Sequence, residues 1–236
     1  MSFVLQYREA GRSESLAELD AKMSRRQPKR SIRKRRTKYI GMFKAKVLVI
    51  GPCEVGKTVL SNYLADATEM SSGEYYPTEG VRILEFEVES VALNDGRSAN
   101  VEVELWDCSG NHKFENCWPA IQKDTNGVVF VLNPEKSDQV KDLDNWYLHF
   151  VRQQGIKDSQ CMVFVHHKPG QAENARANLS SNFSRIRVSH TNLEDDPDGI
   201  KEVFRQYLEN IVSNLADRRD QEELSIVNNR QSTAAY

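Results

Sequence analysis

The sequence predicts an α/β domain built on a mostly parallel, six-stranded sheet with helices on both faces. From residue 44 onward, short apolar segments alternate with segments of helical periodicity, as in folds whose parallel strands are connected by helices. The first apolar segment, "KVLVI", runs directly into the glycine-rich loop "GPCEVGKT". A buried strand followed by such a loop and a helix is typical of nucleotide-binding domains.

The elements follow from local pattern, in chain order. Apolar, β-branched runs bounded by polar or turn residues predict strands at Lys46–Ile50, Val81–Glu89, Val101–Trp106, Gly127–Leu132, Cys161–Val165 and Ile186–Ser189. Helical periodicity predicts helices at Lys57–Ala67, His112–Lys123, Asp138–Arg152 and Gly199–Ala216. The turn signal "NDGR" predicts a hairpin between the second and third strands, and residues 171–184 allow only a short or irregular helix.

Charge separates the first 41 residues from the rest of the chain. Residues 1–41 carry 12 Lys and Arg but only 4 Asp and Glu, a net charge of +8, whereas residues 42–236 carry a net charge of −10. We expect a disordered basic extension over residues 1–41, a nucleotide-binding domain over residues 42–216 and a polar, flexible tail over residues 217–236. The run "RRQPKRSIRKRRTK" could serve as a nuclear-localisation or nucleic-acid-binding arm, but a solvated extension is the favoured interpretation.

Composition places the domain among globular proteins. The chain of 236 residues is 39% hydrophobic, which is enough for a core, and no apolar run approaches the roughly 20 residues that span a bilayer. Its four cysteines form no C-x-x-C pair, which indicates reduced thiols and a cytoplasmic location.

The glycine-rich loop has the spacing of a phosphate-binding loop. Two glycines allow its amides to point inward at a phosphate, and the helix that follows adds the positive end of its dipole. We expect Lys57 to reach the β- and γ-phosphates and Thr58 to bind Mg²⁺, while the carboxylate of Glu54 must point to solvent. The predicted loop residues are Gly51, Pro52, Cys53, Glu54, Val55, Gly56, Lys57 and Thr58.

A second phosphate-side motif lies in "ELWDCSGNHKF". Asp107 at a strand end can hold Mg²⁺ through water, and Gly110 can donate its N–H to a γ-phosphate. Between the two motifs, Thr78 could close over the same metal and phosphate. The predicted metal ligands are thus Thr58, Thr78 and Asp107, and the second nucleotide-binding stretch comprises Asp107, Cys108, Ser109, Gly110 and Asn111.

This ordered set of motifs resembles the Ras-like small GTPases, especially the Rab-like group. In that comparison "PTEG" is switch I and "WDCSG" is switch II, and the strings "YYPTEGVRILEFE", "CWPA", "VFVHHKPG" and "TNLEDDP" resemble the Rab-like protein 5 family of intraflagellar transport. The resemblance covers roughly residues 42–228. It implies a Ras-like fold, GTP or GDP with Mg²⁺, coiled-coil partners in intraflagellar transport complex B, and a location in cilia or at their base.

Two positions depart from a working GTPase. Asn111 stands where Ras-like proteins usually carry the Gln that orients the attacking water, and its shorter side chain predicts slow hydrolysis. Asn111 is therefore a weak catalytic candidate beside Thr78, and it is as readily a simple polar surface residue. In the base-reading motif, Gly170 replaces the Asp that bonds guanine, so weak GTP binding and unselective purine binding both remain open.

The remaining base contacts are assigned to His166, His167, Lys168 and Pro169. Either Thr191 or Asn192 could compensate for the missing carboxylate. Adjacent histidines on a strand point to opposite faces, which disfavours a shared metal ion.

The sequences of the two ends carry no recognised lipidation signal, which bears on how the protein is localised. The chain ends without a cysteine and has Ser2 where myristoylation needs glycine, so we expect localisation through protein contacts and neither a lipid anchor nor membrane insertion. Three functions are open: a slow GTPase-like adaptor, a true nucleotide switch and, less favoured, a nucleic-acid-associated protein recruited by the basic arm. The aromatic residues Trp118, Trp146, Tyr147 and Phe150 fit a core better than an interface.

Overall fold

The computed structural model describes residues 38–67, 76–136, 140–168, 170 and 177–233. The chain divides into two units, residues 1–36 and residues 37–236, and all described residues belong to the second unit. The predicted disordered extension therefore lies almost entirely outside the described residues. Its predicted boundary at residue 41 is too late, because the first strand already begins at Tyr39 and pairs there with Ser98.

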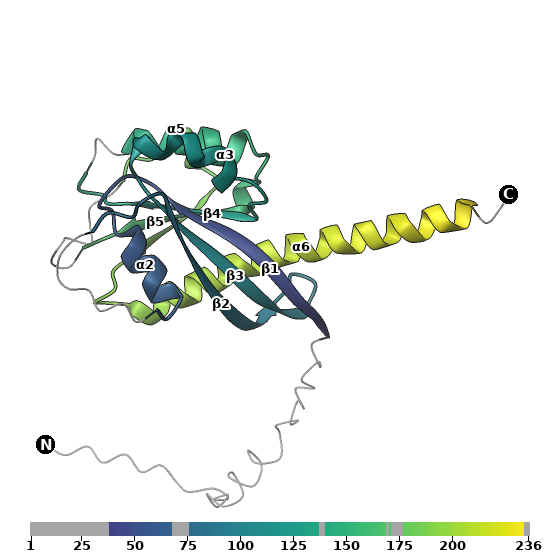
Figure 1. Ribbon diagram of the computed structural model, residues 1–236. Coiled ribbons are helices and arrows are strands. Elements are labelled where there is room, and N and C mark those ends of the chain that lie inside the picture. Colours follow the sequence, from purple (N-terminus) through teal and green to yellow (C-terminus); the bar gives the residue numbers. More distant parts are fainter. Residues whose placement is uncertain (1–37, 68–75, 137–139, 169, 171–176, 234–236) are drawn as a thin grey trace, which may run out of the picture. The chain divides into compact units, whose positions relative to one another are not determined.

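The six predicted strands form one sheet in the order β2-β3-β1-β4-β5-β6 (Figure 1). They are β1 (Tyr39–Ile50), β2 (Val81–Ala92), β3 (Ser98–Cys108), β4 (Gly127–Leu132), β5 (Cys161–His166) and β6 (Arg187–Thr191). The predicted hairpin is confirmed, because β2 and β3 pair antiparallel; the other neighbours are parallel. The prediction of a mostly parallel sheet is thus confirmed.

Helices cover both faces of the sheet. They are α2 (Lys57–Leu64), α3 (Trp118–Ile121), α5 (Asp142–Tyr147) and α6 (Pro197–Thr233), with 3₁₀ turns at His112–Cys117, Asp158–Gln160 and Ser181–Phe183 and a π-helical turn at Leu148–Arg152. Figure 1 shows α2 and α6 on one side of the sheet and α3 and α5 on the other. This layering leaves the carboxyl ends of the parallel strands open for a ligand.

The core has two halves because β1 is buried on both faces. Val47 and Val49 pack into the cluster that contains α2 and α6, whereas Leu48 and Ile50 pack into the cluster beneath α3 and α5. Alternate residues of a strand point to opposite faces, so an uninterrupted apolar run is what a central strand of a two-layered core requires.

The four aromatic residues singled out in the sequence belong to the core. Trp118, Trp146, Tyr147 and Phe150 are each at most 7% exposed. Trp118 and Phe150 meet edge to face with ring centroids 5.1 Å apart, and Trp146 stacks on Phe150 at 5.6 Å. Their large apolar areas hold α3 and α5 onto the sheet, so they are not available as interface anchors.

Two predicted helices are interrupted. The segment predicted as a helix over His112–Lys123 is a 3₁₀ turn followed by the four-residue α3, because Pro119 has no N–H and its ring clashes with a preceding carbonyl in a continuous helix. The segment predicted over Asp138–Arg152 is α5 followed by the π-helical turn, and its first residues lie outside the described part of the chain.

The predicted tail is largely helical. α6 runs from Pro197 to Thr233 without a break, although the sequence pattern placed its end at Ala216. Beyond Ala216 the apolar stripe stops, but residues 218–224 are mostly good helix formers, and Arg218 pairs with Glu222 one turn later. No helix in the described part of the chain is long and apolar enough to cross a membrane.

Candidate nucleotide-binding site

The predicted phosphate, metal and base residues meet at one edge of the sheet. β1, β3 and β5 are parallel members of that sheet, so their carboxyl ends lie at the same edge. The phosphate loop follows β1, Asp107 is near the end of β3, and His166 ends β5. This edge is where open α/β sheets bind ligands, because the loops leaving parallel strands form a crevice there.

Close packing fixes the two glycines of the phosphate loop. Gly51 has a φ of +140°, and a Cβ there would lie 2.2 Å from the carbonyl oxygen of Val131. Gly56 has a φ of +92°, and its Cβ would lie 2.4 Å from Cδ2 of His166. Any other residue would have to displace the backbone of β4 at the first position or the ring of His166 at the second. The two glycines of the phosphate-loop motif are therefore required sterically.

Lys57 is buried inside the phosphate loop that precedes it. Its Nζ donates to the carbonyl oxygen of Gly51 at 2.9 Å and to that of Pro52 at 2.6 Å. Burial lowers the pKa of the Lys57 ammonium, whereas the Asp107 carboxylate acts in the opposite direction. Two of the three ammonium protons hold the side chain across the loop, which leaves the third available to a ligand.

Three oxygen-bearing side chains form a chain of contacts beside the lysine. Oγ1 of Thr58 lies 2.9 Å from Oγ1 of Thr78, which donates to Oδ2 of Asp107 at 3.3 Å. The structure thus brings together the three residues predicted to bind metal, although they come from α2, the segment before β2 and β3.

These residues fit Mg²⁺. Hydroxyl and carboxylate oxygens are the donors that Mg²⁺ prefers, and Oδ1 of Asp107 is buried without a hydrogen-bond partner. Burial raises the pKa of Asp107, and the Thr58 hydroxyl and the Lys57 charge oppose that shift. A buried carboxylate with an unsatisfied oxygen is costly by itself, and a divalent cation reached directly or through water would compensate that cost.

The segment after β3 packs directly on the phosphate loop. A Cβ on Gly110 would lie 2.4 Å from the backbone carbon of Pro52 and 2.5 Å from the nitrogen of Cys53. Ser109 donates its N–H to the carbonyl oxygen of Gly80 at 2.8 Å, which links this segment to the one that carries Thr78. Cys108 is buried, and that burial raises the pKa of its thiol, so it is a packing residue and not a nucleophile.

The acidic residue in the phosphate loop is neutralised by a lysine that the sequence did not reveal. Glu54 has a φ of +62° and an exposed side chain, and its Oε2 lies 3.0 Å from Nζ of Lys136. This pair lowers the pKa of Glu54. The side chain of Val55, by contrast, is fully buried. The expectation that Glu54 faces solvent thus holds, and Lys136 reduces its repulsion of a polyanion.

Asn111 caps a 3₁₀ turn. Its Oδ1 accepts a hydrogen bond from the backbone N–H of Lys113 at 3.0 Å, and its own N–H donates to Oγ of Ser109 at 3.3 Å. The side chain is exposed and committed to the turn that begins at His112. Of the two interpretations left open by the sequence, this geometry favours the structural one.

The two base-side histidines point to different neighbours. Nδ1 of His166 lies 3.2 Å from Oγ1 of Thr191, and Nε2 of His167 lies 3.0 Å from Nδ1 of His190. Burial, reinforced by the charges of His167 and Lys168, lowers the pKa of His166 to about 4, so this ring is neutral at pH 7. Among the described residues no group of three His, Cys, Asp or Glu side chains could hold a metal ion.

The two residues proposed to replace the missing carboxylate are engaged elsewhere. Thr191 is buried against His166, and its carbonyl oxygen accepts from the N–H of His167 at 2.9 Å. Oδ1 of Asn192 accepts from the N–H of Glu194 at 3.0 Å. Gly170 has a φ of +77°, and Pro169 lies outside the described residues. Thr191 therefore positions the histidines, and Asn192 shapes the loop after β6.

The fold and this site together define a Ras-like small GTPase domain. A profile of the family described as "Ras of Complex, Roc, domain of DAPkinase" matches residues 46–169. Intraflagellar transport protein 22 homologs from Xenopus tropicalis and Homo sapiens are each 46% identical over 187 residues, which is 79% of this chain and 100% of each relative. The chain belongs to the intraflagellar transport protein 22 family.

Solved structures of a trypanosome relative have the same fold. The GTP-bound crystal structure of T. brucei IFT22/74/81 contains a chain with a TM-score of 0.61 and 33% identity, covering 74% of this chain and 99% of that one. GDP-bound T. brucei IFT22 matches with a TM-score of 0.53 and 29% identity, covering 72% and 97%. The resemblance to Rab-like intraflagellar transport proteins is confirmed.

Proposed function

We propose that this small GTPase of intraflagellar transport binds GTP and GDP with Mg²⁺, hydrolyses GTP slowly and docks on coiled-coil subunits of complex B. The observation that carries the proposal is Lys57, which is buried in a loop whose own carbonyls hold it in place. Burying a lysine ammonium costs free energy, and the negative charge of a phosphate group above the loop would offset that cost.

Different groups around Lys57 would contact different parts of the nucleotide. The loop amides and the N-terminus of α2 would face the β-phosphate, and α2 has no acidic residue in its first turn to repel it. Mg²⁺, when bound, would neutralise charge between the β- and γ-phosphates. Thr58 and Asp107 would hold it from the protein side. Thr78 bonds both and would sense the γ-phosphate.

Guanine is the base we favour. Structures of a family member are described as GTP-bound and GDP-bound, and this chain aligns with 97% or more of each. Lys168 can lie along the base as in other Ras-like proteins. Because Gly170 brings no carboxylate, we expect the preference for guanine over adenine to be weaker than usual by about two decades, the worth of a charge-assisted hydrogen bond.

Slow hydrolysis and docking follow from separate features. Asn111 stands at the position that usually orients the attacking water, but its side chain is engaged in capping a turn. We therefore expect slow hydrolysis.

One structural neighbour is a complex of IFT22 with IFT74 and IFT81, and on that basis we assign this chain to the same kind of assembly, in cilia and at their base. A nucleotide switch is the alternative, since Thr78 lies where a γ-phosphate could change its contact with Asp107.

The test is mass spectrometry of the nucleotide that co-purifies with the full chain under native conditions. We expect GDP or GTP at close to one per chain, and Lys57→Ala should remove it. Lys44→Ala is the matched control, because Lys44 is an exposed lysine paired with Glu102 on the sheet surface. Nucleotide retained by Lys57→Ala at the control level would refute the site.

A further inference from the structure

The phosphate loop carries an acidic residue in the segment that would enclose the phosphates of a nucleotide. Glu54 lies between the two glycines of the loop and has a φ of +62°, a left-handed conformation that strains a residue with a side chain. Its carboxylate pairs with Lys136, whose Nζ lies 3.0 Å from Oε2. Neither the backbone conformation nor the negative charge favours a glutamate in a loop that binds phosphate.

Lys136 is held in place by the turn that follows β4. Oδ1 of the buried Asn133 accepts from the N–H of Glu135 at 3.0 Å, and its carbonyl oxygen accepts from the N–H of Lys136 at 3.2 Å. The same end of β4 packs against the phosphate loop, because a Cβ on Gly51 would lie 2.2 Å from the carbonyl oxygen of Val131. The fold therefore places this lysine beside the loop, and the ion pair adds to that placement.

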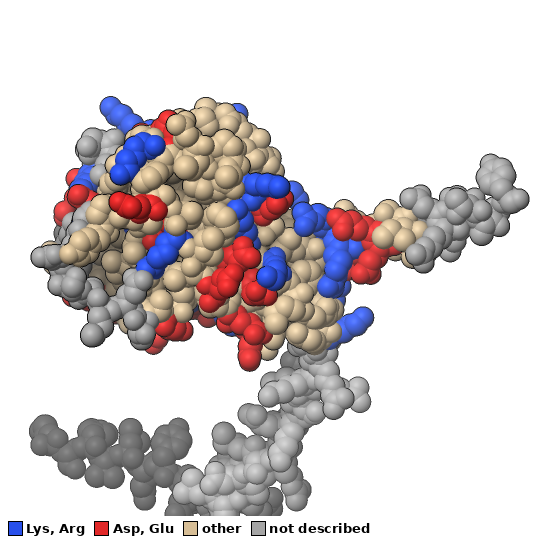
Figure 2. All heavy atoms as spheres, viewed as in Figure 1, with Lys and Arg blue, Asp and Glu red and all other residues tan. Residues whose placement is uncertain are grey.

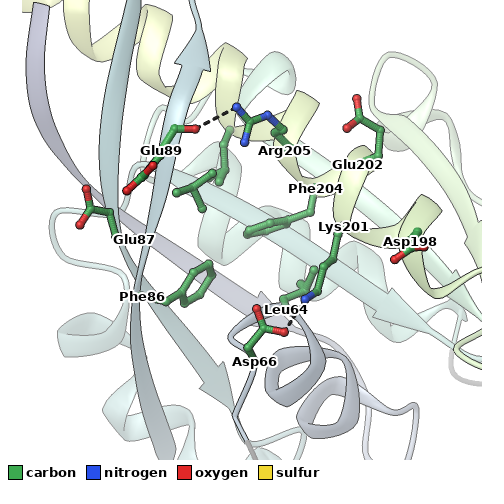
Figure 3. A pocket seen from close by; sticks show the side chains of 12 residues that line it. Leu64, Asp66, Phe86, Glu87, Glu89, Asp198, Lys201, Glu202, Phe204 and Arg205 are labelled. Carbon is green, nitrogen blue, oxygen red and sulfur yellow. Dashed lines mark hydrogen bonds and ion pairs between the residues drawn. The ribbon is translucent and has the colours of Figure 1, made fainter.

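An exposed ion pair is not by itself evidence of function. Acidic and basic side chains lie beside one another on the face shown in Figure 2, and exposed pairs of this kind contribute little to stability. Lys201 and Asp66 provide a comparison (Figure 3), because Asp66 is also an exposed acidic residue with a positive φ, of +51°. That pair lines the concavity between β2 and α6, beyond the carboxyl end of α2, whereas the phosphate loop precedes the amino end of α2.

The charge of Glu54, by contrast, acts within the nucleotide site. The hydrogen bond and the charge of Lys136 lower the pKa of Glu54, and the charge of Lys168 adds to that shift, so the carboxylate is ionised at pH 7. Lys168 is the lysine that we expect to lie along the base. A carboxylate that interacts with this lysine from within the phosphate loop would also interact with a nucleotide bound between them.

The two charges of the pair should affect a bound nucleotide in opposite directions. The carboxylate of Glu54 repels the phosphates, whereas the ammonium of Lys136 neutralises that carboxylate. Removing the charge of Glu54 should therefore hold the nucleotide more tightly, and removing the charge of Lys136 should hold it less tightly. A pair that only braced the loop would behave differently, because either substitution would loosen the loop.

We propose that the pair of Glu54 with Lys136 sets the rate at which this domain releases its nucleotide. Glu54 speeds release by repelling the phosphates, and Lys136 limits that effect by compensating the carboxylate. This inference rests on the proposed nucleotide site and adds to it an internal control of nucleotide exchange.

The test measures the release of N-methylanthraniloyl-GDP from the full-length chain with Mg²⁺, followed by fluorescence after excess unlabelled GDP is added. Glu54→Gln keeps an oxygen that can accept from Lys136 but removes the charge, and it should slow release by about threefold or more. Lys136→Gln should speed release by about threefold or more. Both effects should shrink as salt rises, because ions screen exposed charges.

Asp66→Asn and Lys201→Gln are the matched control variants, because they remove the same charges from the comparison pair. The eight residues of α2 span roughly 12 Å, which exceeds the Debye length at physiological salt. Each control should therefore leave the release rate within about 1.5-fold of wild type. Urea unfolding without nucleotide verifies that all four variants fold.

Faster release from both Glu54→Gln and Lys136→Gln would identify a pair that only braces the loop and would overturn the proposal. Release rates of these two variants that equal those of the controls would overturn it as well. A wild-type chain that binds no labelled GDP would instead refute the proposed nucleotide site, which Lys57→Ala tests separately.

Discussion

Gly56 and His166 lie against each other where the phosphate loop becomes α2. The imidazole of His166 leaves no room for a side chain at Gly56, since a Cβ there would lie 2.4 Å from Cδ2 of His166. Gly56→Ala should therefore destabilise the protein beyond the ordinary cost of a left-handed alanine, by about 1 to 3 kcal/mol. The measurement is urea unfolding without nucleotide.

Gly155→Ala provides the comparison for Gly56→Ala. Gly155 has a φ of +66° and nothing within 4 Å of a Cβ, so it reports backbone strain alone. If the two variants unfold at the same urea concentration, the ring contact with His166 does not constrain the loop. Partial recovery in Gly56→Ala/His166→Ala would locate the clash at that ring.

His166 also makes stability depend on pH. Its pKa is about 4 in the folded protein because burial disfavours the charged ring, against an ordinary value of 6.5. The unfolded chain therefore binds more protons between these values, and stability falls as pH drops from about 6.5 to about 4, by up to about 3 kcal/mol. Urea unfolding at pH 7.5, 6 and 4.5 measures this loss.

His166→Gln should flatten that pH profile. The amide can still face Thr191 but does not titrate. His112 acts in the opposite sense, because Asp142 and Glu115 raise its pKa, and its effect cancels when variant and wild type are compared. A slope unchanged by the substitution would assign the pH dependence to other groups.

At the scale of single elements, the 3₁₀ turn after β3 contains the weak catalytic candidate. Asn111 caps this turn through the N–H of Lys113. Asn111→Ala should cost roughly 1 kcal/mol, as for other caps, and should change single-turnover GTP hydrolysis less than about tenfold. A loss of a hundredfold or more in hydrolysis with unchanged nucleotide affinity would instead show that the amide orients water.

The distal part of α6 is an element that packing does not maintain. Residues 221–228 are exposed throughout, and the pair of Arg219 with Glu223 spans 4.0 Å on the surface. Deleting residues 221–236 should lower the helical signal in circular dichroism but shift Tm by no more than about 2 °C, because exposed ion pairs contribute little.

A shorter truncation product provides the contrast for that deletion. Ending the chain at Tyr207 also removes Leu208, Ile211 and Val212, which belong to the core, and should prevent folding. A drop in Tm of more than about 5 °C on deleting only residues 221–236 would show that the distal helix packs on the domain.

Sequence pattern predicted some elements better than others for physical reasons. All six strands were found, because β4 and β5 are buried at every position and an uninterrupted apolar run has few other uses. The distal part of α6 was missed because it lacks an apolar stripe. The phosphate loop was recognisable because Gly51 and Gly56 are sterically obligatory, whereas the engagement of Thr191 with His166 depends on the pairing of β5 with β6, which no local pattern encodes.

At the scale of the whole molecule, the proposed adaptor and the alternative switch differ in one measurable quantity. A nucleotide can redirect a partner only if the partner binds the GTP and GDP states with different free energies. Here Thr78 is tied to Thr58 and Asp107 by hydroxyl contacts, and Ser109 is tied to Gly80, so the segments that sense the γ-phosphate are cross-linked by the protein itself.

We therefore expect the proposed coiled-coil partner to bind the GDP-loaded and GTP-loaded chains with affinities within about threefold, which corresponds to less than about 0.7 kcal/mol of coupling. Isothermal titration of each loaded form measures this difference. Thr78→Ala is the matched variant, because it removes the tie to Asp107 and should change partner affinity little if docking is indifferent to the γ-phosphate. A difference of thirtyfold or more between the loaded forms, abolished by Thr78→Ala, would mean that the molecule is a switch, since only a state-dependent contact can produce such coupling.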